Sequence, residues 1–160
     1  MASRSRARSR AGRHPARYDR RHPDPLTPPD EDVDDEIALA DTSLFIAVEQ
    51  DRPLSRPPSR VAISVVTVAE LRLGVLAAQD GSTRAQRLET LSAAASLDPL
   101  PIDEGVAHAW ATLRLALRDA GKRMPINDSW IAATAIANDM VVASQDADYD
   151  DIPGLRVVRV

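Results

Sequence analysis

The sequence contains no cysteine and only three histidines among its 160 residues. Disulfide bonds, thiol catalysis and cysteine-ligated zinc are therefore excluded, and a metal site rich in histidine is not expected. No apolar run approaches the roughly 20 residues that a membrane-spanning helix needs. The chain also lacks the apolar core of a secretory signal peptide. These absences leave oxygen ligands, above all carboxylates, as the groups with which this chain can build a site.

The net charge of -4 hides an uneven distribution of charge along the chain. Residues 1–21 hold eight arginines, and a proline-rich and then acidic stretch follows up to residue 36. Such a segment buries too little apolar surface to offset the entropy lost on ordering, so we predict a disordered tail over residues 1–36. Two alternatives remain open: a basic arm that binds RNA, and a translation start assigned too early, with the chain beginning near Ile37. A transit peptide is disfavoured because the segment has no apolar face.

Residues 37–160 are numerous enough for one domain with a sizeable core. Apolar runs that suit strands buried on both faces alternate there with segments of helical periodicity. The expected strands lie at 37–40, 60–67, 100–102, 141–144 and 155–160, and the expected helices near 42–48, 65–79, 82–96, 104–120 and 126–138. This alternation predicts an α/β fold, a three-layer α/β/α sandwich with a mainly parallel central sheet.

Apolar stripes indicate which side of each expected helix is buried. The last helix, 126–138, is apolar on nearly every side and is expected to lie in the interior. Glu70 lies one position off the stripe of its helix, at the border of the expected buried face. The stripes of the helices at 65–79, 82–96 and 104–120 are Val66, Ala69, Leu73 and Leu76; Leu88, Leu91 and Ala95; and Val106, Trp110, Leu113 and Leu117.

Four acids share one kind of position: Asp41 and Asp146 follow buried strands, Glu70 lies on the helix after the second strand, and Asp128 opens a buried helix. Each has a simpler explanation, such as a helix cap for Asp41 or Asp128 or a solvated side chain for Glu70. However, the carboxyl ends of parallel strands meet at one edge of a sheet, where ligands bind. Carboxylates gathered there repel one another unless a cation intervenes. An all-oxygen site favours Mg²⁺ or Mn²⁺, which assist phosphodiester hydrolysis.

Four segments together resemble a PIN domain, and most closely the VapC-type toxin ribonucleases of bacterial toxin–antitoxin pairs. They are ADTS at residues 40–43, ISVVTVAEL at 63–71, NDSWIAATA at 127–135, and the end of the chain from 141 to 160. The resemblance implies that Asp41, Glu70 and Asp128 bind metal, and that Asp146 or its neighbour Asp148 is the fourth acid. It also implies Mg²⁺-dependent endoribonuclease activity, a homodimer, inhibition by a cognate antitoxin and a cytoplasmic location.

Two other function classes are alternatives to this nuclease. A non-catalytic PIN-like module would bind RNA or a protein through the same cleft, but acids at all four positions favour the enzyme. A phospho-aspartate phosphatase or receiver built on Asp41 is disfavoured. The phosphatase requires a second aspartate where Ser43 stands, and the acids at 34–36 lie in a polar run before the strand rather than in the pattern of a receiver.

Overall fold

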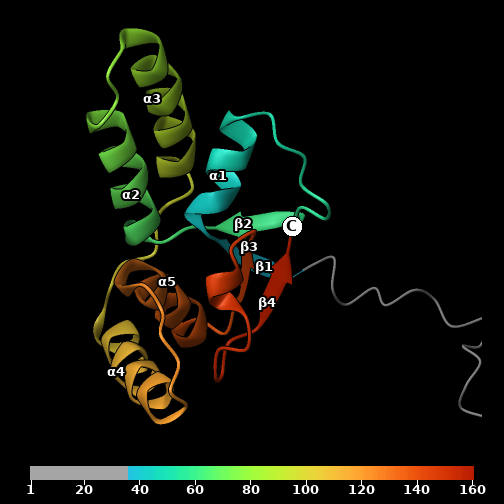
Figure 1. Cartoon of the computed structure of the whole chain (residues 1–160), viewed down its shortest axis with the longest axis vertical. Helices are drawn as coiled ribbons and strands as arrows, with labels where there is room; N and C mark the ends of the chain where they lie inside the picture. The colour runs from blue at the N-terminus through green and yellow to red at the C-terminus, as the bar shows by residue number, and fades with distance from the viewer. Residues whose placement is uncertain (1–35) are drawn as a thin grey trace, which may run out of the picture. The chain divides into compact units, whose positions relative to one another are not determined.

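A computed structural model describes residues 36–160 (Figure 1). The predicted tail lies outside these residues except for Glu36, whose carboxylate pairs with Arg156, and the division of the chain at this point stays a prediction. The described part contains four strands, β1 (Ile37–Ala40), β2 (Arg60–Ala62), β3 (Val141–Ser144) and β4 (Val157–Arg159). Its helices are α1 (Thr42–Glu49), α2 (Val65–Leu76), α3 (Gly81–Ala95), α4 (Glu104–Asp119) and α5 (Ile126–Ala137), with a short 3-10 helix, η1 (Ala147–Tyr149).

The four strands form one parallel sheet in the order β2-β1-β3-β4, with Ala40 of β1 opposite Ala143 of β3. Successive residues of β1 point to opposite faces. Ala38 and Ala40 pack with residues of α1, α2 and α3, whereas Leu39 packs with residues of α4 and α5. The two helical groups therefore cover opposite faces of the sheet (Figure 1), and the predicted three-layer α/β/α sandwich is confirmed.

Local sequence signals explain several helix ends. Asp41 and Asp103 cap α1 and α4, because their side chains accept bonds from the backbone N–H of Ser43 and Val106. Gly121 adopts a φ of +66° directly after the cap of α4, and backbone bonds from residues 121 and 122 close that helix end. This is the left-handed conformation that glycine adopts without strain. The chain can then turn back toward α5. Within the described residues, no helix is both long and apolar enough to cross a membrane.

The predicted buried stripe of α2 is wrong. Leu73 and Leu76 are 65% and 74% exposed, whereas Thr67 and Leu71 are buried. The reason is that α2 packs against α3 and the sheet through the adjacent face of the helix, which carries Thr67 and Leu71. Because Thr67 is polar, this face does not read as an apolar stripe in the sequence. On α3, Leu91 is buried as predicted, but Leu88 is half exposed. An apolar strip on the outer side of α2 therefore remains open to solvent.

The predicted strand at residues 100–102 is also wrong. Leu100 forms a single parallel bridge with Ser64 and goes no further. Its neighbours Pro99 and Pro101 have no backbone N–H to donate, so a ladder cannot extend on either side. The second predicted strand ends at Ala62, and the chain enters α2 from Ser64, which caps it. The last strand, β4, forms an edge of the sheet as predicted, with Arg156 and Arg159 exposed.

Candidate metal centre

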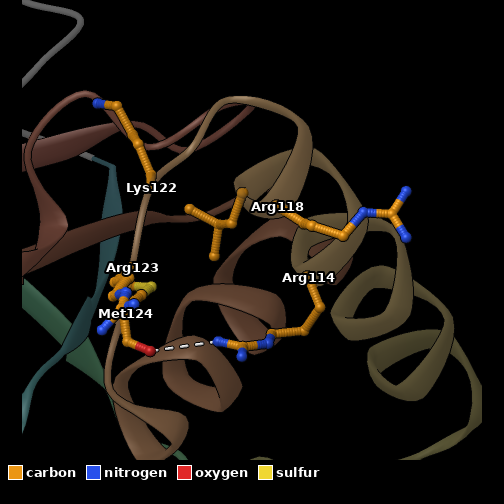
Figure 2. Close-up of a pocket in the computed structure, with 6 residues that line it drawn as sticks. Arg114, Arg118, Lys122, Arg123 and Met124 are labelled. Atoms are coloured by element: carbon orange, nitrogen blue, oxygen red, sulfur yellow. Dashed lines mark hydrogen bonds between the residues drawn. The ribbon is translucent and has the colours of Figure 1, made fainter.

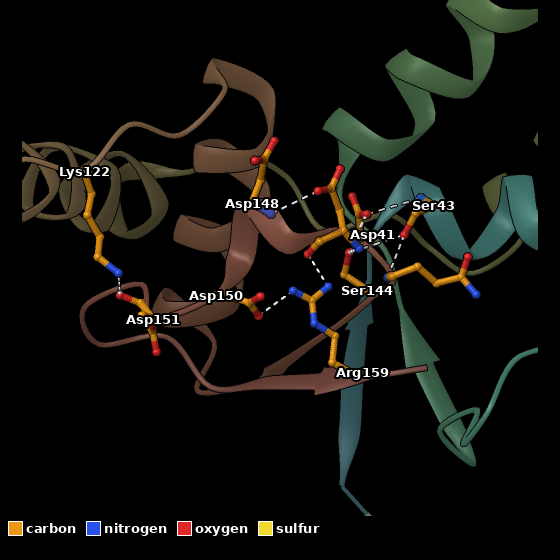
Figure 3. Close-up of polar contacts among 10 residues, drawn as sticks. Asp41, Ser43, Lys122, Ser144, Asp148, Asp150, Asp151 and Arg159 are labelled. Atoms are coloured by element: carbon orange, nitrogen blue, oxygen red, sulfur yellow. Dashed lines mark hydrogen bonds and ion pairs between the residues drawn. The ribbon is translucent and has the colours of Figure 1, made fainter.

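The four acids that the sequence singled out come from separate elements of the fold. Figure 3 shows two acids of this region, Asp41 at the end of β1 and Asp148 in η1. Asp41 follows β1 directly, and Asp146 lies two residues beyond β3. Because β1 and β3 are parallel neighbours, these two positions lie side by side, and the Asp41 N–H donates to the carbonyl of Ala143 at 3.0 Å. Glu70 projects from the middle of α2, and Asp128 from the first turn of α5.

The Asp41 carboxylate is nearly buried, with 5% of the residue exposed. One oxygen, Oδ2, accepts from the hydroxyl of Ser144 at 2.9 Å and from the Ser43 N–H at 3.3 Å. The other oxygen, Oδ1, accepts from the Tyr149 hydroxyl at 3.1 Å. Burial and the negative charge of Asp41 both raise the pKa of Tyr149, so that its hydroxyl keeps its proton and remains a donor. Asp41 is thus both the predicted cap of α1 and a fixed member of the acidic group.

Glu70 turns toward neighbouring elements and not simply into solvent. The hydroxyl of Thr42, at the start of α1, donates to its Oε2, and the side-chain amide of Asn127, on α5, donates to its Oε1 at 2.9 Å. These two bonds tie α2 to both helical layers at the level of Asp41 and Asp128. The carboxylate is therefore held at the junction of three helices, which supports the alternative that it points into a cleft.

Asp128 does not cap α5, so that interpretation of the sequence is wrong. The helix begins at Ile126, directly after Pro125, and its N-terminus has no side-chain cap bond. The rigid ring of Pro125 presets the backbone there, which places Asp128 in the first turn beyond any capping position. Its carboxylate instead lies in a trio with Asp146 and Asp148, in which one oxygen from each side chain lies within 4.8 Å of the others.

The loop after β3 carries two of these three acids. Asp146 accepts a bond from the Asp148 N–H at 3.0 Å through its Oδ1, and its own N–H donates to the hydroxyl of Ser144 at 2.9 Å. Arg159 of β4 donates to the main-chain carbonyl of Asp146 and pairs with the carboxylate of Asp150 (Figure 3). Both acids of the trio that come from this loop are exposed, so the alternative between Asp146 and Asp148 stays open.

The acidic group has an electrostatic consequence at Asp128. Its pKa is raised to about 7, first by burial and then by the negative charges of the other acids, in the order Asp41, Glu70, Asp146 and Asp148. Within residues 36–160, no lysine or arginine forms an ion pair with any of these five carboxylates. Several acids without a cationic partner, offering only oxygen atoms, are the donor set that a hard divalent cation prefers.

This raised pKa predicts how the stability of the metal-free protein depends on pH. Between about pH 4 and 7 the folded protein retains the proton on Asp128 while the unfolded chain releases it, so stability from this group falls as pH rises. We expect the melting temperature of the wild type in EDTA, measured relative to Asp128→Asn, to fall from about pH 5 to about pH 8. Parallel pH profiles for the two proteins would show that Asp128 has an ordinary pKa.

Some functional contacts gave no signal in the sequence. Tyr149 is fully buried and bonds to Asp41 across 108 positions of the chain. Trp110, expected in the core, is only partly buried and stacks on Trp130, with ring centroids 4.4 Å apart. Its indole N–H donates to the hydroxyl of Ser129 at 3.0 Å, which fastens α4 to the first turn of α5. A helical stripe can predict that Trp110 faces inward, but not which side chain it meets.

Comparisons with known proteins agree with this geometry. The model of the PIN domain family matches residues 38–155. Ribonuclease VapC5 of Mycobacterium tuberculosis is 48% identical over 124 residues, which are 76% of this chain and 92% of the relative. A crystal structure of VapBC-5, a member of the VapBC family of toxin-antitoxin systems from the same organism, has a TM-score of 0.69 at 44% identity. The match covers 78% of this chain and 98% of the chain in that structure. The structure of FitAcB from Neisseria gonorrhoeae has a TM-score of 0.60 at 34% identity, and the match covers 76% of this chain and 95% of the FitAcB chain. The residues that match the family model include all five acids of this centre, Asp41, Glu70, Asp128, Asp146 and Asp148.

Proposed function

Since the chain belongs to the PIN-domain family and, within it, to the VapC-type ribonucleases, we propose that it is a metal-dependent endoribonuclease and the toxin of a toxin–antitoxin pair. The observation that carries this proposal is the trio of Asp128, Asp146 and Asp148 beside Asp41 and Glu70, all without a cationic partner among the described residues. The gathering of these carboxylates costs folding free energy through their mutual repulsion unless a cation lies among them.

We propose that Asp41, Glu70, Asp128 and Asp146 hold Mg²⁺, with Mn²⁺ as a substitute. The residues fit such an ion, because every donor is a carboxylate oxygen and the pKa of Asp128 is raised first by burial and then by the negative charges of the neighbouring acids. When bound, the cation would lower the pKa of a water molecule and neutralise charge on the scissile phosphate.

The side chains around the acids position them for this work. Ser144 and Tyr149 hold the Asp41 carboxylate in place at the end of β1, while Thr42 and Asn127 orient Glu70. Ordered partners of this kind typically support metal ligands in proteins. One acid of the group would act as the general base that accepts the proton of the attacking water.

The proposed partners are an RNA substrate, a cognate antitoxin and a second copy of the chain, all in the cytoplasm. The related structure VapBC-5, a member of a family of toxin-antitoxin systems, supports the antitoxin. Leu73 and Leu76, on the open side of α2, supply apolar area of the kind that protein partners cover. We also propose that an arginine of the antitoxin takes the place of the cation, so that antitoxin and Mg²⁺ compete at constant ionic strength.

The direct test is cleavage of a mixed RNA pool by the purified full-length protein, free of antitoxin, with the new 5′ ends mapped by sequencing. We expect cleavage in Mg²⁺ and none in EDTA. Binding of RNA without cleavage under both conditions would instead support the alternative, a non-catalytic PIN-like module. An RNA that is neither cleaved nor bound would contradict both.

A pair of variants distinguishes the two candidates for the fourth acid. We expect Asp146→Asn to lower cleavage by about tenfold or more, and Asp148→Asn to lower it less. Both side chains are exposed, but the main chain of Asp146 is held by Arg159 and by Ser144. Asp151→Asn, in the same loop but outside the trio, is the matched control. A larger loss in Asp148→Asn would assign the fourth position to Asp148.

A further inference from the structure

The molecule also carries a cluster of positively charged side chains. Four cationic residues surround a hollow of about 370 Å³ at the end of α4 and in the loop that leads to α5 (Figure 2). Leu117 and Met124 complete its lining. We call this feature the basic pocket, and its cations are Arg114, Arg118, Lys122 and Arg123.

The basic pocket is joined to both segments that carry the acidic trio. Arg123 lies five positions before Asp128 in the chain, and Arg114 donates to the carbonyl of Met124 at 3.2 Å, which braces the loop between them. On the other side, Lys122 donates to the carbonyl of Asp151 at 2.6 Å, in the segment that continues from Asp148 (Figure 3). Any chain bound in the pocket would therefore lie close to the loops that carry the metal ligands.

Most of the positive charge in this pocket is not neutralised. Arg114 and Lys122 bond to main-chain carbonyls, which carry no net charge. Arg118 pairs only with its neighbour Asp119, and both side chains are largely exposed, at 74% and 62%. An exposed pair of this kind contributes about 0–1 kcal/mol and is readily exchanged for another anion.

The directions of the side chains indicate the kind of anion. Figure 2 shows the side chains of Arg114, Arg118 and Lys122 pointing away from one another. They do not converge on a point where one small anion would sit. Spread charges of this kind suit a polyanion whose phosphates pass over the surface one after another. Arg114 is also held in place, because its guanidinium lies 6.0 Å from the centre of the Trp110 ring.

The acidic group creates a need for such a surface. Its carboxylates repel the phosphates of an approaching RNA, so attraction must come from cations beside the metal site. We propose that the basic pocket binds the phosphate backbone of the RNA strand that flanks the scissile bond. This rests on the proposed function for the identity of the polyanion. The connection to both acid-bearing segments favours the substrate over an acidic segment of a protein partner.

The test removes the two cations that do not brace the loop, in the double variant Arg118→Gln/Arg123→Gln. The matched control is Arg56→Gln/Arg72→Gln, which removes the same charge from exposed positions of the 51–59 loop and α2. Equilibrium binding of a labelled single-stranded RNA is measured across a range of salt concentrations with each pair of changes placed in Asp128→Asn protein, so that the probe stays intact. Cleavage kinetics are measured with each pair in the wild-type background. Melting temperatures in EDTA check that both double variants are folded.

If the pocket binds RNA, each lost phosphate contact reduces the slope of log affinity against log salt by about 0.7, and two contacts reduce it by about 1.4. At moderate salt this corresponds to a dissociation constant about tenfold higher. We expect KM to rise by a similar factor while kcat is unchanged, and we expect the control variant to behave like its parent.

Several results would overturn the proposal. One is a salt slope and KM equal to those of the control. Another is weakened binding of purified antitoxin with unchanged RNA affinity, which would assign the pocket to a protein partner. Displacement of RNA by low-millimolar inorganic phosphate at constant ionic strength would indicate a single-anion site. The proposed function fails separately: a wild type that binds RNA through the pocket but does not cleave it would remove the nuclease and leave this inference standing.

Discussion

Asp128→Asn is expected to abolish most RNA cleavage without destabilising the metal-free protein. Asparagine keeps the size of the side chain but removes one charge from the acidic group, so a cation is bound less well and cleavage should fall by about 100-fold or more. In EDTA the variant should melt at an equal or higher temperature, because a partly buried carboxylate with a raised pKa has been removed. The measurements are cleavage of a mixed RNA and melting curves with and without Mg²⁺.

The response to Mg²⁺ provides the second part of that experiment. An ion that binds only the folded state stabilises it by about 2.7 kcal/mol at a hundredfold excess over its dissociation constant. The wild type should therefore melt higher in Mg²⁺, and Asp128→Asn should show a much smaller rise. Asp103→Asn is the matched control, because Asp103 precedes the first turn of α4 and caps that helix through Val106, at 2.9 Å. A variant at Asp128 that cleaves RNA at the wild-type rate would remove this residue from the metal site.

Asp41→Ala is expected to lose both activity and stability. Its carboxylate is the shared acceptor for Ser43, Ser144 and Tyr149, and alanine would leave these donors without that acceptor. Burying donors without acceptors costs about 1–3 kcal/mol for each group. Relief of repulsion within the acidic group offsets part of that, so we expect a net loss of about 3 kcal/mol, or roughly 10 °C in melting temperature.

Two further variants separate the structural and chemical roles of Asp41. Asp41→Asn retains one oxygen and the shape of the side chain, so it should lose cleavage and the response to Mg²⁺ while keeping most of the stability. Tyr149→Phe removes a single donor and should lower stability by about 1 kcal/mol, with cleavage reduced only modestly. Equal stability of the Asp41→Ala protein and the wild type in EDTA would contradict the bonding described here.

The wrong prediction about α2 has a practical consequence for the partners. A helical stripe of leucines indicates that a surface is covered by something, but it does not identify what covers it. Within this chain, α3 and the sheet cover the line that contains Thr67 and Leu71, and this leaves Leu73 and Leu76 exposed. The stripe seen in the sequence is therefore available to another molecule, in agreement with the proposed antitoxin and second copy.

The sequence by itself determined the order of the five helices and of four of the five expected strands, the parallel sheet and the four candidate acids. These depend on signals within single segments: apolar runs mark β1 and β3, Asp41 caps the helix that follows it, and the many alanines of α5 mark a buried helix. Acids at the ends of parallel strands must then meet at one edge, because strands of the same direction end together.

Only the tertiary structure decided how those acids are held. Asp128 has the residue type of a helix cap, yet it lies in the first turn of α5 without a capping bond, and its carboxylate lies in the trio with Asp146 and Asp148. Tyr149 carries no signal in its own segment and meets Asp41 only when β3 pairs with β1. A local pattern records the periodicity of one segment. The distance between two side chains far apart in the chain depends on how their elements pack, and the chemistry of this centre depends on those distances.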